Sequence, residues 1–431
     1  MDILIISVTF FVIFFSTIVF CVKKNAIRLN GFLFFSIGFV YYWLIPSVLM
    51  YFLESSMPEE LDLVFSRYSR ISEDNKLLYV ILSCIFYVLF AIGYSIARGT
   101  SEKKNKIISK KSNAVVFFWS FMALLGVVLA TVMALPISNY FFKAYDSSLF
   151  ENYQDGVVQD AIPRGTFIAA TSILFILCFM RAVIKNGHLK KINKIIFDPY
   201  MLIYYVFAIL ALSMGGRLYF VTNIIAIIIF FSVYFDLKIR LREFFLIGMM
   251  GAGVAALWGV LRAGGNFSFG NMLLNLAQEP LLTSVSAFAF LEDGKFPLLN
   301  FPIFLISDFT NLLPSSLFPE KIQYLLNPQD LGYEIYMPLG GLHIFVSLVI
   351  NFGIVGAAFF FTCIGFLVGK FERSSMSVQA VTIYCFVCSW LTFSLNRDPF
   401  SVSLVKNIFE ISLLIPLILY LIQKIIFKKH V

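Results

Sequence analysis

The chain has 431 residues, of which 60% are hydrophobic and only 13% are charged, against about 25% charged residues in a typical soluble domain. Its 33 lysine and arginine residues outnumber its 25 acidic residues, which gives a net charge of +8. This composition excludes a soluble globular protein and indicates an integral membrane protein. The apolar runs do not alternate as barrel strands do, so we expect an all-α, polytopic bundle of membrane helices.

An apolar run of about 20 residues is long enough to cross a bilayer as a helix, and the sequence offers about 11 such runs. We expect the first run to be a retained helix, because no lysine precedes it and no small-residue cleavage site follows it. The predicted spans are residues 3–22, 31–53, 77–97, 114–136, 165–184, 200–215, 219–235, 244–261, 344–369, 377–394 and 404–424.

Lysine and arginine collect in alternate loops, which indicates the orientation of the chain through the positive-inside bias. With the N-terminus outside and the C-terminus cytoplasmic, most basic residues face the cytoplasm and few acids accompany them. Membrane topology therefore explains the net positive charge without any binding of nucleic acid. The residues placed on the cytoplasmic side are Lys23, Lys24, Arg28, Arg98, Lys103, Lys104, Lys106, Lys110, Lys111, Arg181, Lys185, Lys190, Lys191, Lys194, Lys238, Arg240, Arg242, Lys370, Arg373, Lys424, Lys428 and Lys429.

Three sizeable loops are predicted on the outer face, at residues 54–76, 137–164 and 262–343. Loops as long as the third are usually functional. Its segment "FPIFLISDFTNLLPSSLFPEK" is apolar but interrupted by prolines and polar residues, so we expect interfacial or re-entrant helices there and not a further span. We treat residues 1–431 as a single membrane domain, since no internal repeat is evident.

Four arginines are predicted at the outer edge of the membrane, where the positive-inside bias should deplete them: Arg164, Arg217, Arg262 and Arg397. An arginine at the centre of a membrane helix costs about 2.5 to 3.5 kcal/mol, so each needs a partner. A diphosphate is one partner, since its oxygens match the planar guanidinium. Lipid phosphates or a nearby acid such as Asp398 are the alternative. Glycine pairs beside Arg217 and Arg262 allow close approach of a ligand, so we place those two first and Arg397 next.

His343 is the one histidine outside the predicted cytoplasmic segments, and its ordinary pKa of about 6.5 suits proton transfer at neutral pH. Its position equally fits a structural role, as a polar residue at the end of a membrane helix. Glu334, Asp308 and Glu279 of the large loop are competing bases.

No phosphate-cradling loop, serine nucleophile motif or cluster of metal-binding carboxylates is present in the sequence. A lone histidine does not make a zinc site. Lys406 and Glu410, four residues apart inside the last run, fit a helix-stabilising ion pair. We therefore expect no cofactor and a metal-independent activity.

Four motifs together resemble the Wzy-type oligosaccharide repeat-unit polymerases of bacterial O-antigen and capsule synthesis, which are related to the O-antigen ligases. They are "MGGR" at 214–217, "LPSSLFPEK" at 313–321, "MPLGGLHIFVSLVINFGIVG" at 337–356 and "FSLNRDPF" at 393–400. The architecture of many spans with one large outer loop before the last few agrees along the whole chain. The ligases carry a histidine-rich element at the end of that loop, whereas here His343 stands alone, which leaves Glu334 as the rival base.

The resemblance implies a GT-C-like glycosyltransferase in the bacterial cytoplasmic (inner) membrane that polymerises undecaprenyl-diphosphate-linked oligosaccharides on the outer face. Arg217, Arg262 and Arg397, with Lys321 of the proline-rich motif, would hold the diphosphate. A general base, His343 or Glu334, would take the proton of the acceptor hydroxyl. The partners implied are the lipid bilayer and, in the pathway, a chain-length regulator and a flippase.

Two rival functions remain at the level of the sequence. A ligase would transfer finished polymer to a lipid acceptor and would need the same residues. A flippase or transporter of lipid-linked oligosaccharide would bind its cargo near the middle of the membrane, so the large outer loop disfavours it.

Overall fold

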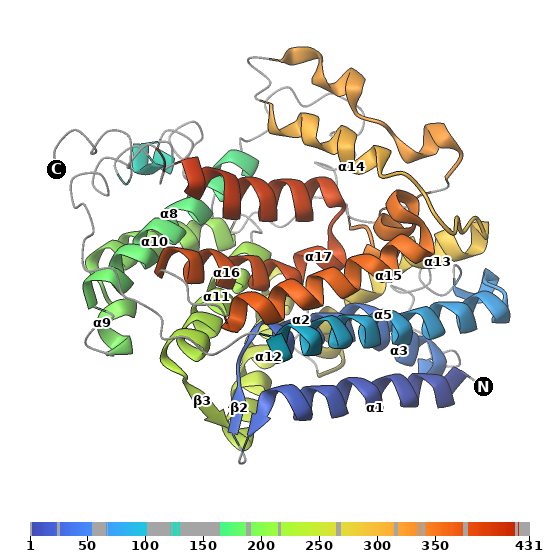
Figure 1. Ribbon diagram of the computed structural model, residues 1–431, viewed down its shortest axis with the longest axis horizontal. Coiled ribbons are helices and arrows are strands. Elements are labelled where there is room, and N and C mark those ends of the chain that lie inside the picture. The colour runs from blue at the N-terminus through green and yellow to red at the C-terminus, as the bar shows by residue number, and fades with distance from the viewer. Residues whose placement is uncertain are drawn as a thin grey trace.

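The computed structural model is a bundle of long helices (Figure 1). Seven of the described helices are long and apolar enough to cross a membrane, as expected for a helical membrane protein, while the total of about 11 spans stays a prediction. The structure describes residues 2–23, 26–53, 66, 68–100, 121, 124–126, 128–129, 164–186, 191–213, 217–263, 269–313, 318–333, 335, 337, 341–373, 378–418 and 421.

The described helices coincide closely with the predicted apolar runs. The fourth run, 114–136, lies mostly outside the described residues. Because each run is apolar along its length, the helices can bury or expose any face to lipid. The helices that match the other runs are α1 (Asp2–Cys21), the consecutive α2 (Gly31–Phe39), η1 (Val40–Leu44) and α3 (Ile45–Leu53), α5 (Glu73–Thr100), α8 (Arg164–Asn186), α10 (Pro199–Ser213), α11 (Arg217–Phe235), α12 (Leu241–Ala263), α15 (Ile344–Arg373), α16 (Val378–Thr392) and the π-helix η9 (Ser401–Leu414).

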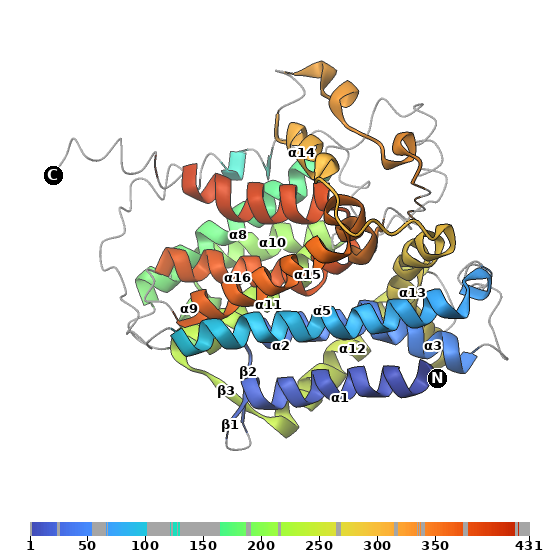
Figure 2. The same cartoon turned by 45° about the vertical axis from the view of Figure 1, so that its right-hand side comes forward.

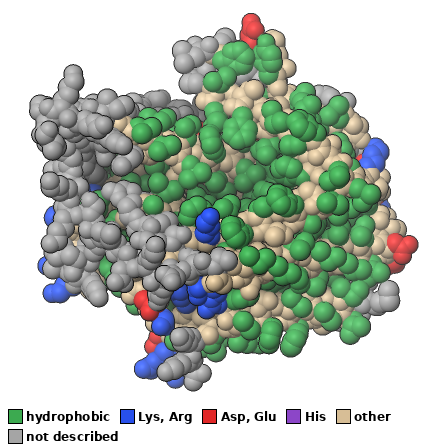
Figure 3. Space-filling model, viewed as in Figure 1, with side chains coloured by type: hydrophobic (Ala, Val, Ile, Leu, Met, Phe, Trp, Pro, Cys, Tyr) green, Lys and Arg blue, Asp and Glu red, His purple; other side chains and the backbone are tan. Residues whose placement is uncertain are grey.

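The long helices α1, α5 and α15 run side by side in both ribbon views (Figures 1 and 2). Hydrophobic side chains cover most of the face in Figure 3, and lysine and arginine gather near the end that carries the strands. We call the end with the strands and the last residues of α15 the inner end. The outer end carries α3, α13 (Phe269–Asp293) and the residues just before α15; both names follow the predicted orientation.

The bundle is all-α as expected, apart from a small antiparallel sheet at the inner end that the sequence did not predict. The sheet is formed by β1 (Val22–Lys23), β2 (Ala26–Arg28) and β3 (Lys238–Arg240), in that order. Ile27 lies opposite Ile239 in the register. The hairpin after α1 is thereby joined to the segment after α11, two loops that the charge pattern places on the same side.

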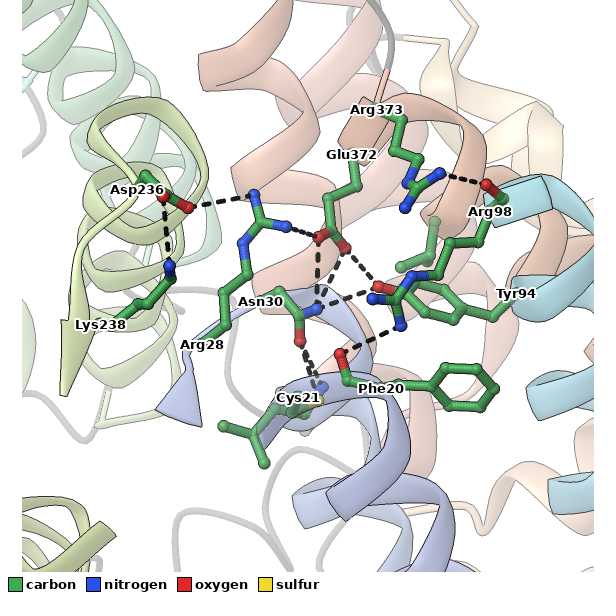
Figure 4. A network of polar contacts seen from close by, with 12 residues as sticks. Phe20, Cys21, Arg28, Asn30, Tyr94, Arg98, Asp236, Lys238, Glu372 and Arg373 are labelled. Atoms are coloured by element: carbon green, nitrogen blue, oxygen red, sulfur yellow. Dashed lines mark hydrogen bonds and ion pairs between the residues drawn. The ribbon is translucent and has the colours of Figure 1, made fainter. Parts of the chain in front are cut away.

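Buried Glu372, near the end of α15, is the centre of a polar network at the inner end (Figure 4). It accepts from Arg28 Nη1 at 3.0 Å, from the hydroxyl of Tyr94 at 2.7 Å and from Asn30 Nδ2 at 3.2 Å. Arg373 donates to the carbonyl of Arg98. The network joins α15 to α5 and to the β2–α2 connection, so several basic segments predicted as cytoplasmic lie together in space.

The predicted outer loop 262–343 contains one long helix, α13, which the sequence analysis did not foresee. Leu281, Val285, Phe288 and Leu291 recur at helical spacing and are buried against the bundle. Pro280 stands inside this helix and made the segment resemble a loop. Four short helices follow: α14 (Ile303–Asp308), η5 (Phe309–Leu312), η6 (Pro319–Tyr324) and η7 (Pro328–Leu331).

Helix α15 is broken at Gly353, where φ is 72° and ψ is 178°. Only glycine adopts this conformation readily. Segment 297–300 fills the break and bonds the backbone groups that the break frees. Its bonds are Ile354 N to Pro297 O at 3.0 Å, Val355 N to Leu298 O at 3.0 Å, Asn300 N to Phe352 O at 3.2 Å and Asn300 Nδ2 to Ile350 O at 2.6 Å.

A methyl group at Gly353 should destabilise the protein. Its Cβ would lie 2.6 Å from the carbonyl oxygen of Leu298, and the backbone conformation is itself unfavourable for alanine. We expect Gly353→Ala to lower the free energy of unfolding by about 1 to 3 kcal/mol or more, measured as a lower thermal midpoint in detergent. Gly251→Ala on α12 is the control, because nothing lies within 4 Å of its Cβ position. Equal midpoints for the two variants would contradict the role of the break.

Candidate functional site

Charged and polar side chains meet at the outer end, where η1, α13 and the short helix α17 (Ser394–Arg397) come together. Arg397 Nε donates to Glu279 Oε1 at 3.0 Å, and Asp398 Oδ1 lies 3.9 Å from the same nitrogen. Glu279 Oε1 also accepts from the hydroxyl of Tyr42 at 3.4 Å. The Arg397 and Glu279 side chains remain 29% and 35% exposed. The guanidinium is therefore held by acids in a pair that reaches the protein surface.

Local structure fixes the backbone that carries Arg397. The carbonyl of Arg397 accepts from Leu342 N at 2.7 Å, which joins α17 to the segment before α15. The preceding Asn396 donates to the carbonyl of Thr392 at 3.0 Å and accepts from Trp43 Nε1 at 3.2 Å. Pro399 disfavours a helical Asp398, whose ψ of 148° ends α17. Arg397 thus sits on a tightly held corner between α16 and η9.

Asp398 begins a series of hydrogen bonds that leads from this corner into the bundle. It accepts from Ser394 Oγ at 2.7 Å, and Ser394 Oγ in turn accepts from Asn407 Nδ2 at 2.9 Å. Asn407 Oδ1 accepts from the hydroxyl of Tyr219 at 3.5 Å. Burial raises the pKa of the Asp398 carboxyl, against the opposing effects of Arg397 and Ser394. We call Arg397, Asp398, Ser394, Asn407 and Tyr219 the polar seam.

His343 lies directly before α15 and is fully buried. Its Nδ1 accepts from Phe345 N at 3.2 Å, so the proton of the neutral ring is on Nε2. Nε2 lies 3.2 Å from the carbonyl of Tyr42 and 3.2 Å from the hydroxyl of Tyr79. The His343 N–H donates to Ser286 Oγ at 2.8 Å. Both ring nitrogens and the backbone donor are therefore used inside the protein.

These contacts make His343 the cap of the first turn of α15. Burial lowers its pKa to about 3, because a charged imidazole would lose its hydration there. In this conformation the ring offers no open nitrogen to a substrate. The geometry therefore favours the structural interpretation of His343, and its role as a base stays a prediction.

The remaining predicted site residues are placed only through their backbones or not at all. Arg217 begins α11 two residues before Tyr219, and Arg262 lies at the end of α12, which packs against the helix of Glu279. Lys321 lies in η6, and Glu334 is outside the described residues. Of the predicted ligands, the structure places Arg397 in the polar group, with the start of α11 tied to the same group through Tyr219.

Sequence reasoning gave Glu279 and Asp398 too little weight. Glu279 was one of several loop acids, because Pro280 concealed the helix that carries it. Asp398 was only a possible partner of Arg397, and the closer partner is Glu279. The informative signal was that Glu279 is the one charged residue in the 20-residue segment 272–291. Within the described residues, no three histidine, cysteine or acidic side chains are grouped as metal ligands; metal independence stays a prediction.

Asp308, at the end of α14, is half-buried and has no hydrogen bond or ion pair to any described residue. Burial raises its pKa to about 6, which suits a group that exchanges protons near neutral pH. It lies next to Ser307, whose hydroxyl accepts from Leu326 N at 3.4 Å and so ties α14 to the segment after η6.

Replacing Asp308 by asparagine should change how stability depends on pH. The pKa of Asp308 is about 6 in the folded protein and about 3.9 in the unfolded chain, so folding favours the neutral carboxyl. The stability that the neutral carboxyl contributes is therefore fully present below pH 4 and is lost as the pH rises through 6. Asp308→Asn should therefore have the higher thermal midpoint at pH 7, and this advantage over the wild type should shrink towards pH 4. The exposed Glu73→Gln is the control. If the difference in thermal midpoint between Asp308→Asn and the wild type does not vary with pH, the pKa of Asp308 is not raised by burial.

No family model matches the chain, and no curated protein or solved structure matches it.

Proposed function

We propose that the chain polymerises oligosaccharide repeat units carried on a polyprenyl diphosphate at the outer face of a bacterial cytoplasmic membrane. The observation that carries this proposal is Arg397: a partly exposed arginine, paired with acids, on a hydrogen-bonded corner at the predicted outer end of an apolar helical bundle. A diphosphate linked to a membrane lipid stays at this level, between the hydrocarbon and the water. The motif resemblance supports the same substrate class.

The reaction transfers a glycosyl group between two lipid-linked molecules. The acceptor sugar hydroxyl attacks the anomeric carbon of the donor, a new C–O bond forms, and the bond from that carbon to the diphosphate oxygen breaks. The polyprenyl diphosphate leaves with the electron pair of the broken bond. Its charge increases during this step, so a guanidinium aimed at it stabilises the transition state more than the ground state.

The acceptor proton needs a base, and we assign it to a carboxylate of the site. Glu279 is half-exposed and in contact with Arg397, so a diphosphate that bonds Arg397 competes directly with Glu279. The released carboxylate then lies beside the leaving group and is open to the acceptor hydroxyl. His343 has no open nitrogen for this step, while Glu334 remains the alternative suggested by the sequence.

The grouping in space of basic segments at the inner end agrees with the orientation predicted from the sequence. Arg28, Arg98, Lys238 and Arg373 belong to segments that the network around Glu372 and the small sheet hold together. Such a collection of basic residues on one side is typical of a cytoplasmic face. The Arg397 group lies towards the other end of the bundle, which the proposal takes as the outer side.

The break in α15 is the observation that favours a transporter of the same lipid-linked sugars, because discontinuous helices often form transport sites. In transporters the freed backbone groups face a ligand or an ion. Here segment 297–300 bonds the freed groups on both sides of Gly353. The polymerase therefore remains the better-supported function, and a ligase would use the same chemistry on another acceptor.

Arg397→Ala should reduce chain extension roughly 100- to 1000-fold, because it removes a donor aimed at the leaving group. The assay is polymer length on a gel, with purified protein and lipid-linked repeat units in nanodiscs. Arg397→Lys should restore little activity, since an ammonium does not reproduce the bidentate fork.

Lys295→Ala is the matched control for the loss of a basic residue. This lysine is 58% exposed, pairs with Asp293 on the same side of the protein and does not contact the Arg397 group. It should leave extension unchanged. Wild-type polymer length from a folded, inserted Arg397→Ala variant would remove the central support of the proposed function.

A further inference from the structure

Lys406 is a charged residue inside an apolar helix. It is the sixth residue of η9, within the candidate span Ser401–Ile418, and its neighbours Val405 and Asn407 are buried. The side chain of Lys406 is half-buried. No described residue forms a hydrogen bond or ion pair with it, and the expected pair with Glu410 is absent from the structure.

The position of Lys406 connects it to the polar seam. The next residue, Asn407, donates to Ser394 and accepts from Tyr219, and Ser394 leads to Asp398 and Arg397. Lys406 precedes Asn407 on η9 and lies five residues after the first residue of this helix, Ser401. Arg397 lies before the start of η9, at the outer end of the bundle. Lys406 therefore lies deeper along η9 than Arg397, close to the level of Asn407.

An ammonium at this depth is costly without an anionic partner, because it loses much of its hydration there. The nearest acid of the seam, Asp398, is already engaged by Ser394 and lies beside Arg397. The winding of η9 as a π-helix over 14 residues is a further sign, since π-helical turns occur frequently at functional sites. These observations point to a bound anion at Lys406.

A polyprenyl diphosphate has the matching arrangement of charge. Its hydrocarbon chain enters the membrane, so the phosphate attached to the lipid lies deeper than the phosphate attached to the sugar. We propose that Lys406 binds the lipid-proximal phosphate of this substrate while Arg397 binds the sugar-proximal phosphate. The proposal rests on the proposed function for the substrate class, and it assigns each phosphate to a different residue.

Binding without catalysis tests this assignment. The full-length protein in phosphatidylcholine nanodiscs is titrated with undecaprenyl diphosphate, undecaprenyl monophosphate and undecaprenol, and binding is followed by native mass spectrometry. Lys406→Met should weaken the binding of undecaprenyl diphosphate and of undecaprenyl monophosphate about ten- to a hundredfold, which is the range for loss of one charged hydrogen bond. The binding of undecaprenol should not change. Arg397→Ala should weaken the diphosphate by a similar factor and the monophosphate little. Lys295→Met is the neutral control.

Several results would overturn the proposal. One is unchanged binding of both phosphates by Lys406→Met. Another is equal loss of undecaprenol, which would mean that the variant had damaged the fold; Lys406→Gln, of different shape, must reproduce the selective loss. If inorganic pyrophosphate binds with the same dependence on Lys406, the ligand is a soluble phosphate and not a lipid. If phosphatidylglycerol nanodiscs abolish the effect, the site takes bulk lipid headgroups.

The outcome is separable from that of the proposed function. If the protein binds undecaprenyl diphosphate through Lys406 but does not extend lipid-linked repeats, the assignment of Lys406 holds and the proposed polymerase activity is wrong. If Lys406→Met extends lipid-linked repeats as well as the wild type does, the polymerase activity stands and Lys406 does not bind the lipid-proximal phosphate.

Discussion

The break of α15 at Gly353 is the constraint on which the outer half of the structure depends. It produces a short half-helix, 344–352, whose first turn is capped by His343 and whose last carbonyls are bonded by Asn300. The residue before the cap, Leu342, bonds the carbonyl of Arg397. If α15 were continuous through residue 353, the half-helix 344–352 would point in another direction, and His343 and Leu342 would lie away from α13 and α17. The corner that presents Arg397 is therefore a consequence of a glycine ten residues from the cap.

The acids at the two ends of the bundle have opposite environments. Glu372 at the inner end is buried and bonded by an arginine, a tyrosine and an asparagine, as a buried charge must be to persist. Glu279 at the outer end is partly exposed and bonded mainly by Arg397. The inner network can only hold helices together, whereas the outer pair can exchange its partners. This contrast supports the proposal that the chemistry takes place at the Arg397 end of the bundle.

Length and hydrophobicity were sufficient to predict most of the helices, because a membrane span must be apolar along some 20 residues. The same logic failed for α13, where Pro280 and several polar residues interrupt the apolar pattern of a helix that is buried on all sides over residues 283–291. The position of Arg397 at the end of a membrane helix could be predicted from the topology, and its role in a site stays a prediction. The roles of His343 and Glu279 could not, because each depends on contacts with residues more than fifty or one hundred positions away in the chain. Such contacts follow from tertiary packing, which the local pattern does not encode.

The most direct measurement of the central claim is an experimental structure of the full chain bound to an undecaprenyl-diphosphate-linked repeat unit. The account predicts the diphosphate at the outer end, within hydrogen-bond distance of the Arg397 guanidinium, with Glu279 displaced from Arg397 and turned towards the sugar. A diphosphate bound at the inner end, beside Lys185 and Lys194, with the Arg397–Glu279 pair intact, would contradict it.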